Sequence, residues 1–140
     1  MSDDPHNLQR FVDVQRSTYD QALAELLAGR KQSHWMWFIF PQLAGLGHSA
    51  MAQRYGIKSI DEAAAYLQHP LLGPRLEECA AALLQHKGRS AQQILGSPDD
   101  IKLRSSMTLF SAVAPETILY RQIIDHFYVS QVDPATLARL

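Results

Sequence analysis

The stretch PRLEECAAALLQHKG, residues 74–88, decides the fold class of this chain. Its apolar residues recur at intervals of three and four, the spacing of one face of an α-helix. They are Leu76, Cys79, Ala80, Leu83 and Leu84. Pro74 suits the first turn of a helix and Gly88 suits its end. The stretch therefore predicts a helix with one buried face.

Similar start and stop signals divide much of the remaining chain into helices. Ser59 with Glu62 three residues later forms a capping box, and His69-Pro70 ends that helix because the residue before proline avoids the helical conformation. Ser97-Pro98-Asp99-Asp100 opens another helix with a cap, a proline and two acids. Further helices are predicted to begin at Ser17 and Thr18, at residues 50 and 90, at Pro115 and at Asp133-Pro134.

No stretch shows clean alternation of apolar and polar residues between hairpin turns, which is the mark of a half-buried strand. Trp35–Phe40 is too short to assign by its period and is either a buried helical turn or a short strand-like segment. We therefore predict a mainly helical, all-α protein that forms a single compact domain over residues 1–140. Residues 1–7 are expected to be a flexible tail.

Composition limits the classes of function. The 140 residues carry 13 basic and 14 acidic side chains, so the chain lacks the lysine and arginine excess of a duplex nucleic-acid binder. The lone Cys79 cannot form an intramolecular disulfide or a CxxC zinc pair. The N-terminus is acidic, unlike a signal peptide, and the longest apolar run is far shorter than the roughly 20 residues of a membrane span. We expect a cytoplasmic protein without membrane contacts; its oligomeric state is left open.

The least ordinary segment is KQSHWMWFIFPQLAGLGHS, residues 31–49, which holds both tryptophans of the chain. One interpretation makes Trp35 and Trp37 anchors of the core, since aromatic side chains bury large areas. In the other, one ring stacks on a ligand base, a contact worth about 1–3 kcal/mol, with Lys31 or His34 near its polar end. Both interpretations stay open from sequence.

Gln42 in the same segment is a further candidate ligand-binding residue, and a glycine-containing turn follows it. Amides at Gly45 and Gly47 precede a predicted helix, where they could approach a phosphate. The alternative is a tight turn in which Ser49 caps that helix.

A second unusual segment is DDIKLRSSMTLF, residues 99–110. On a helix, Lys102 lies near Ser105 and Ser106, and Arg104 adds a second cation. This group could bind a phosphate or a ribose. Equally, it could be a solvated face whose serines bond back to the helix backbone.

Catalytic signals are weak. The six histidines lack metal-ligand spacing, so we predict no metal site, and no GxSxG nucleophile motif or bound cofactor is indicated. The candidates for acid or base chemistry are His34, Glu25 and Asp100. A glycosidic hydrolase would need such a carboxylate to activate water or to stabilise an oxocarbenium-like centre.

Three parts of the chain carry a resemblance to a known family: Lys31–Gln42 with Gly45-Leu46-Gly47, residues 66–76, and residues 100–110. Together they resemble the bacterial and fungal domain-of-unknown-function family 1810, over Phe11 to about Leu140. Some members of that family carry the label calpastatin, which implies a calpain inhibitor. Such inhibitors are long, disordered and repetitive, whereas this chain is compactly patterned. The family is also distantly similar in pattern to the NADAR group of NAD and ADP-ribose processing domains.

The leading hypothesis is binding or N-glycosidic hydrolysis of an NAD- or ADP-ribose-type nucleotide. In that hypothesis Trp35 or Trp37 stacks on the base, and Lys31, Lys102 and Arg104 neutralise phosphates. The alternative is a non-catalytic protein-interaction module that uses the aromatic Trp35–Phe40 segment. The nucleotide hypothesis requires residues 31–49 and 99–110 to meet in space.

Overall fold

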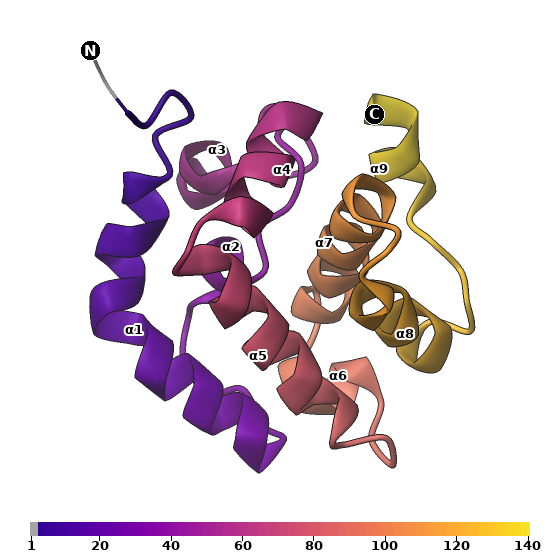
Figure 1. The fold of residues 1–140 in the computed structure, drawn as a ribbon. Coiled ribbons are helices and arrows are strands. Elements are labelled where there is room, and N and C mark those ends of the chain that lie inside the picture. Colours follow the sequence, from indigo (N-terminus) through magenta and orange to yellow (C-terminus); the bar gives the residue numbers. More distant parts are fainter. Residues whose placement is uncertain (1–2) are drawn as a thin grey trace.

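The structure is a computed structural model that describes residues 3–140, and in this range α-helices pack around a shared apolar core (Figure 1). The helices are α1 (Gln9–Ala28), α2 (Met36–Ile39), α3 (Ala50–Tyr55), α4 (Ile60–Gln68), α5 (Leu72–Leu84), α6 (Ala91–Leu95), α7 (Asp99–Val113), α8 (Ile118–Phe127) and α9 (Pro134–Arg139). The described residues contain no strand, only an isolated bridge between Leu43 and Ile57. The predicted all-α class is confirmed.

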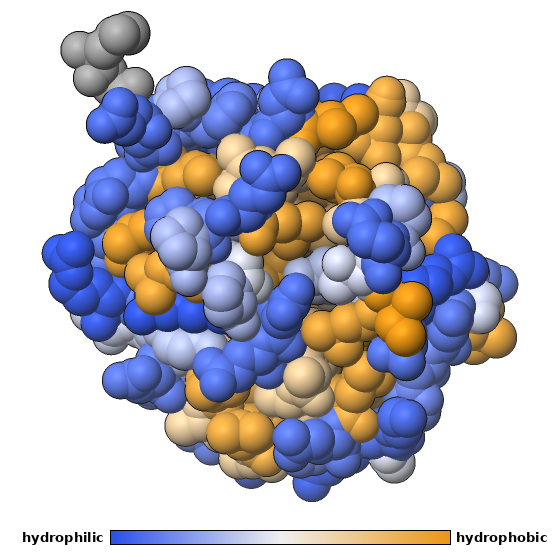
Figure 2. All heavy atoms as spheres, viewed as in Figure 1, coloured by the Kyte–Doolittle hydropathy of each residue, from blue (hydrophilic) through white to orange (hydrophobic). Residues whose placement is uncertain are grey.

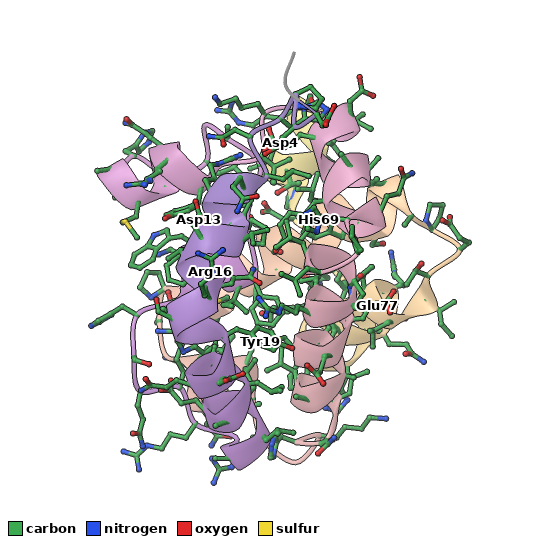
Figure 3. All side chains as sticks on the ribbon, turned by 60° about the vertical axis from the view of Figure 1, so that its left-hand side comes forward. Asp4, Asp13, Arg16, Tyr19, His69 and Glu77 are labelled. Carbon is green, nitrogen blue, oxygen red and sulfur yellow. The ribbon has the colours of Figure 1, made fainter. Side chains whose placement is uncertain are left out.

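Helix α5, which contains most of the stretch that decides the fold, lies between α1, α4 and α8. Its apolar face is buried apart from Leu84, which is partly exposed, and Cys79 belongs to this face, with burial raising the pKa of the thiol to about 12. Figure 3 shows α1 and α5 side by side with Tyr19 between them. The Tyr19 hydroxyl donates to the Glu78 carboxylate, and the Arg75 guanidinium lies 4.4 Å from the centre of the Tyr19 ring. Polar contacts thus border the apolar contact between these helices.

Helix α1 begins eight residues before the predicted start at Ser17 and Thr18, which was wrong. Both hydroxyls lie inside the helix and donate to the carbonyl oxygen of Val14, a bond that serine and threonine can make without ending a helix. The cap is Asp4, whose carboxylate accepts from the N–H groups of Leu8 and Gln9 at 2.7 and 2.8 Å. Residues 3–7 of the predicted tail therefore form a capping turn; residues 1–2 lie outside the described part.

The segment Trp35–Phe40 is a buried helical turn, α2, and not a strand. Five of its six side chains are at most 3% exposed, and only Trp37 is partly exposed. The aromatic run therefore contributes mostly to the core.

Helices α4 and α5 meet at a tight junction. Gly73, in the first turn of α5, is buried against the preceding helix. A Cβ atom at this position would lie 2.1 Å from the carbonyl oxygen of Leu67. Only glycine allows the two backbones to approach this closely.

Hydrophilic residues cover much of the face shown in Figure 2, with apolar residues exposed in an area over α9. Within α9 Leu137 is 46% exposed, and Leu140, directly after the helix, is 38% exposed. Among the described helices, none combines the length and the apolar character required to cross a bilayer.

Candidate functional site

The two unusual segments meet at the N-terminal end of α7. Lys31 Nζ lies 2.9 Å from Oδ2 of Asp99, and Lys102 Nζ lies 3.5 Å from Oδ1 of the same carboxylate. The backbone N–H of Lys31 also donates to the carbonyl oxygen of Ile94, at 2.7 Å. The convergence that the nucleotide hypothesis required is therefore present in the fold.

Each lysine of this group also lies over a tryptophan. Lys31 Nζ is 5.1 Å from the ring centre of Trp35, and Lys102 Nζ is 5.0 Å from that of Trp37. Both distances are within the range of a cation–π contact. We refer to Lys31, Lys102, Asp99, Trp35 and Trp37 as the lysine–tryptophan cluster. Within these five residues two ammonium groups share one carboxylate, and the ionised Glu25 carboxylate lies beside them, bonded to the Trp35 indole.

The cluster is only partly open to solvent. The side chains of Lys31, Asp99 and Lys102 are 8%, 18% and 25% exposed. Charges held this far from water interact more strongly than charges on an open surface. Lys102 is the cation that a ligand would reach first.

Trp35 and Trp37 have different roles. Trp35 is 1% exposed, and its indole N–H donates to Oε1 of Glu25 at 2.9 Å, so its ring is enclosed and cannot receive a base in this structure. Trp37 is partly exposed and lines a crevice of about 10 Å³ with Gln42 and Gly47. The crevice has room for about one water molecule.

Glu25 is tied to the turn that leads into the cluster. Its carboxylate accepts from the N–H groups of Gln32 and Ser33 at 2.8 and 3.0 Å, from the Ser33 hydroxyl at 2.6 Å, and from Trp35. Burial raises its pKa, but these hydrogen bonds outweigh burial and lower the pKa to about 2. A carboxylate this acidic, with its lone pairs engaged, is poorly suited to exchange protons near neutral pH. Its geometry is that of an acceptor that holds the 32–35 turn, and its catalytic role stays a prediction.

The other catalytic candidates lie at the edge of the cluster. His34 is exposed. Asp100 is partly exposed, with Oδ1 buried and without a hydrogen-bond partner among residues 3–140. Neither position shows an arrangement that would activate water.

Arg104 and Ser105 hold the C-terminal segment. The Arg104 guanidinium donates to the carbonyl oxygens of Gln131 and Val132 at 2.8 and 2.7 Å, and the Ser105 hydroxyl donates to Asp133 at 2.8 Å. Asp133 in turn caps α9. Both side chains, predicted as ligand contacts, are thus engaged within the chain, because Val132 and Asp133 return to the face of α7 that carries them.

Packing also accounts for the two glycines. At Gly45 the φ angle is +95°, and an added Cβ would lie 2.6 Å from the Arg139 guanidinium. At Gly47 an added Cβ would lie 2.7 Å from the Cβ of Ala52. The Ser49 hydroxyl accepts from the Ala52 N–H, so the segment has the geometry of the tight turn with a serine cap.

Ser106 is fully buried, and its hydroxyl has no hydrogen-bond partner in the described part of the chain. Because an unpaired buried hydroxyl is unfavourable, Ser106→Ala is expected to leave stability unchanged or to raise it by up to about 1 kcal/mol. Urea denaturation of the two proteins measures this difference. A clear loss of stability would show that the hydroxyl has a partner in solution.

Sequence reasoning assigned Asp99 only to the start of a helix and not to the site, where it bridges the two lysines. Its position three residues before Lys102 on a predicted helix was an available signal, since residues at that spacing are neighbours. The described residues contain no group of three or more histidine, cysteine or acidic side chains placed to hold a metal ion.

Comparison with known proteins places the chain among uncharacterised relatives. The family model described as "Protein of unknown function (DUF1810)" matches residues 5–140. The chain is similar to the conserved hypothetical protein Rv1873 from Mycobacterium tuberculosis, with 51% identity and a TM-score of 0.96 to its crystal structure. The match covers 98% of each chain. No curated protein matches. The chain therefore belongs to the DUF1810 family.

Proposed function

We propose that this protein binds a small phosphorylated ligand of the nucleotide type at the lysine–tryptophan cluster. Lys102 and Lys31 bind the phosphate, and the partly exposed ring of Trp37 stacks on the base. The observation that carries the proposal is the pairing of the lysines: both are largely withdrawn from water, and they share the single carboxylate of Asp99 as their ion-pair partner.

A phosphate suits this arrangement because it carries more negative charge than the Asp99 carboxylate, beside which it would bind. Asp99 lies in the first turn of α7, so an incoming anion would also lie near the positive end of that helix. The phosphate contacts Lys102 first and reaches Lys31 as the Asp99 side chain turns aside. Charge-assisted hydrogen bonds of this kind are stronger than neutral ones.

Trp37 would give the site a preference for ligands that carry an aromatic base. Its indole lies under Lys102, so a base that stacks on it would keep its phosphate close to the same lysine. The distant resemblance of the sequence to NAD and ADP-ribose processing domains is the reason for choosing these two nucleotides as the first ligands to test. Fold-level likeness alone would not support this choice.

The geometry favours binding over hydrolysis. Glu25 accepts bonds from the turn around it, and Asp99 lies between two ammonium groups, so neither is free to activate water. The alternative, an interaction module that uses Trp35–Phe40, is less favoured because most side chains of that segment are buried and offer little surface to a partner.

Calorimetric titration with ADP-ribose, NAD, AMP and inorganic phosphate tests the proposal. We expect saturable binding of at least one nucleotide, weakened about 10- to 100-fold by Lys102→Gln, the loss of one charge-assisted hydrogen bond of about 1.5–3 kcal/mol. Trp37→Leu should weaken the nucleotide and leave inorganic phosphate unaffected.

Lys87→Gln is the matched control, since it removes the same charge from an exposed position outside the cluster. It should bind like the unchanged protein. The proposal is wrong if none of the four probes binds, or if Lys102→Gln and Lys87→Gln bind a nucleotide equally well.

A further inference from the structure

A separate pocket lies near the opposite end of α7 from the lysine–tryptophan cluster. Its volume is about 230 Å³, and its lining includes Leu67 of α4, Glu77 of α5, Val113 of α7, Glu116 of the α7–α8 turn and Tyr120 of α8. At 1.5 Å per residue, Val113 is about 16 Å along the helix axis from Lys102. We call it the α4–α8 pocket. Nothing in the nucleotide proposal uses it.

The charges around this pocket are negative. Glu77 and Glu116 both line it, both are exposed, and neither forms an ion pair among residues 3–140. The C-terminal residues of α4 and α7 also contribute to the lining, and the C-terminal end of a helix carries partial negative charge. The N-terminal end of α8, at Thr117, contributes a partial positive charge, but the two full carboxylate charges outweigh it, so the pocket attracts a cation more than an anion.

Tyr120 gives the pocket a polar group that lacks a partner. Its side chain is 1% exposed, and its phenol oxygen is buried without a hydrogen bond in the described structure. Burial and the negative charge of Glu77 raise the pKa of Tyr120, so the phenol remains protonated. In Figure 3, Glu77 lies on the side of α5 that is turned away from α1. An unsatisfied buried hydroxyl costs stability unless something binds it.

We infer that the α4–α8 pocket binds the ammonium group of a small aliphatic amine. An ammonium group has three N–H donors, and the lining of the pocket contains three residues with acceptor oxygens, Glu77, Glu116 and Tyr120. The side chains of Ala64, Leu67, Val113 and Ala114 provide an apolar wall for a short carbon chain. With about 30 Å³ for each molecule of liquid water, the volume suits a chain of a few carbons.

The probes for this site are n-butylamine and 1,4-diaminobutane, with 1-butanol and butyrate as isosteres that lack the positive charge. Calorimetric titration of the whole chain should show saturable binding of both amines. We expect binding at least tenfold weaker for 1-butanol and none for butyrate.

Three variants separate the pocket from general charge effects. Glu77→Gln and Tyr120→Phe should each weaken amine binding about tenfold or more, and Glu116→Gln repeats the test at an exposed position in a turn. Asp20→Asn removes the same charge from an exposed position on α1 and should bind amines unchanged.

Lys102→Gln should also leave amine binding unchanged, so failure of this inference is distinguishable from failure of the nucleotide proposal. The inference is overturned if neither amine saturates, if 1-butanol binds as tightly as n-butylamine, or if both glutamate variants bind amines like Asp20→Asn.

Discussion

Replacing Glu25 by glutamine is expected to lower the free energy of unfolding by about 3 kcal/mol at pH 7. The carboxylate accepts from two backbone N–H groups, one hydroxyl and the Trp35 indole, and an amide group would turn a donor toward part of this set. A pKa of about 2 against the usual value of 4.5 corresponds to a few kcal/mol of stabilisation by the ionised form. Urea denaturation of both proteins at pH 7 measures the loss.

The stability difference between the unchanged protein and Glu25→Gln is expected to depend on pH. Because the folded protein lowers the pKa of Glu25, the ionised side chain stabilises the fold fully above about pH 4.5, and this contribution is lost as the pH falls toward 2. The difference between the unchanged protein and Glu25→Gln should therefore shrink across this window. Asp20→Asn, an exposed carboxylate on the same helix, is the control and should change stability little at either end. A constant difference from pH 7 to pH 2 would contradict the assigned cap.

Gly73→Ala is expected to destabilise the protein by about 3 kcal/mol, the upper part of the range for overpacking a core. The added methyl group would lie 2.1 Å from the carbonyl oxygen of Leu67, a backbone atom that cannot rotate away. Relief requires α4 and α5 to separate, which disturbs a contact between two core helices. Thermal and urea denaturation both report the change.

Gly88→Ala is the matched control for this substitution. No heavy atom lies within 4 Å of a Cβ added at Gly88, so the change should be neutral or slightly stabilising. Equal stability of the two variants would show that the junction of α4 and α5 is looser than the structure indicates.

The helical class was predictable because caps, prolines and apolar spacing agree along most of the chain. At Ser59, for example, the hydroxyl accepts from the Glu62 N–H as the capping signal predicts. The start of α1 was not predictable from its serine and threonine, because a hydroxyl inside a helix and one at its start look alike in sequence. The helix there continues because Asp4, outside the apolar pattern, provides the cap.

The candidate site was only partly predictable. Lys31 and Lys102 could be chosen by residue type, and they do meet, but the bridge through Asp99 depends on how α7 approaches the 31–35 turn. The separation of Trp35 from Trp37 depends on a four-residue helix that no periodicity reveals. Arg104 and Ser105 were assigned to a ligand because the return of residues 131–133 to α7 is a contact distant in sequence.

The Glu25 cap also divides the assembly of the fold into an early and a late stage. Glu25 and the most distant of these donors, Trp35, are 10 residues apart, and closure of a loop of that length takes on the order of 10–100 ns. The contact of Lys31 with Asp99 joins distant parts of the chain, so a larger loop-closure entropy opposes its formation. The turn that presents Lys31 can thus form from local sequence before α7 arrives, and the lysine–tryptophan cluster is completed only when the two halves of the chain dock.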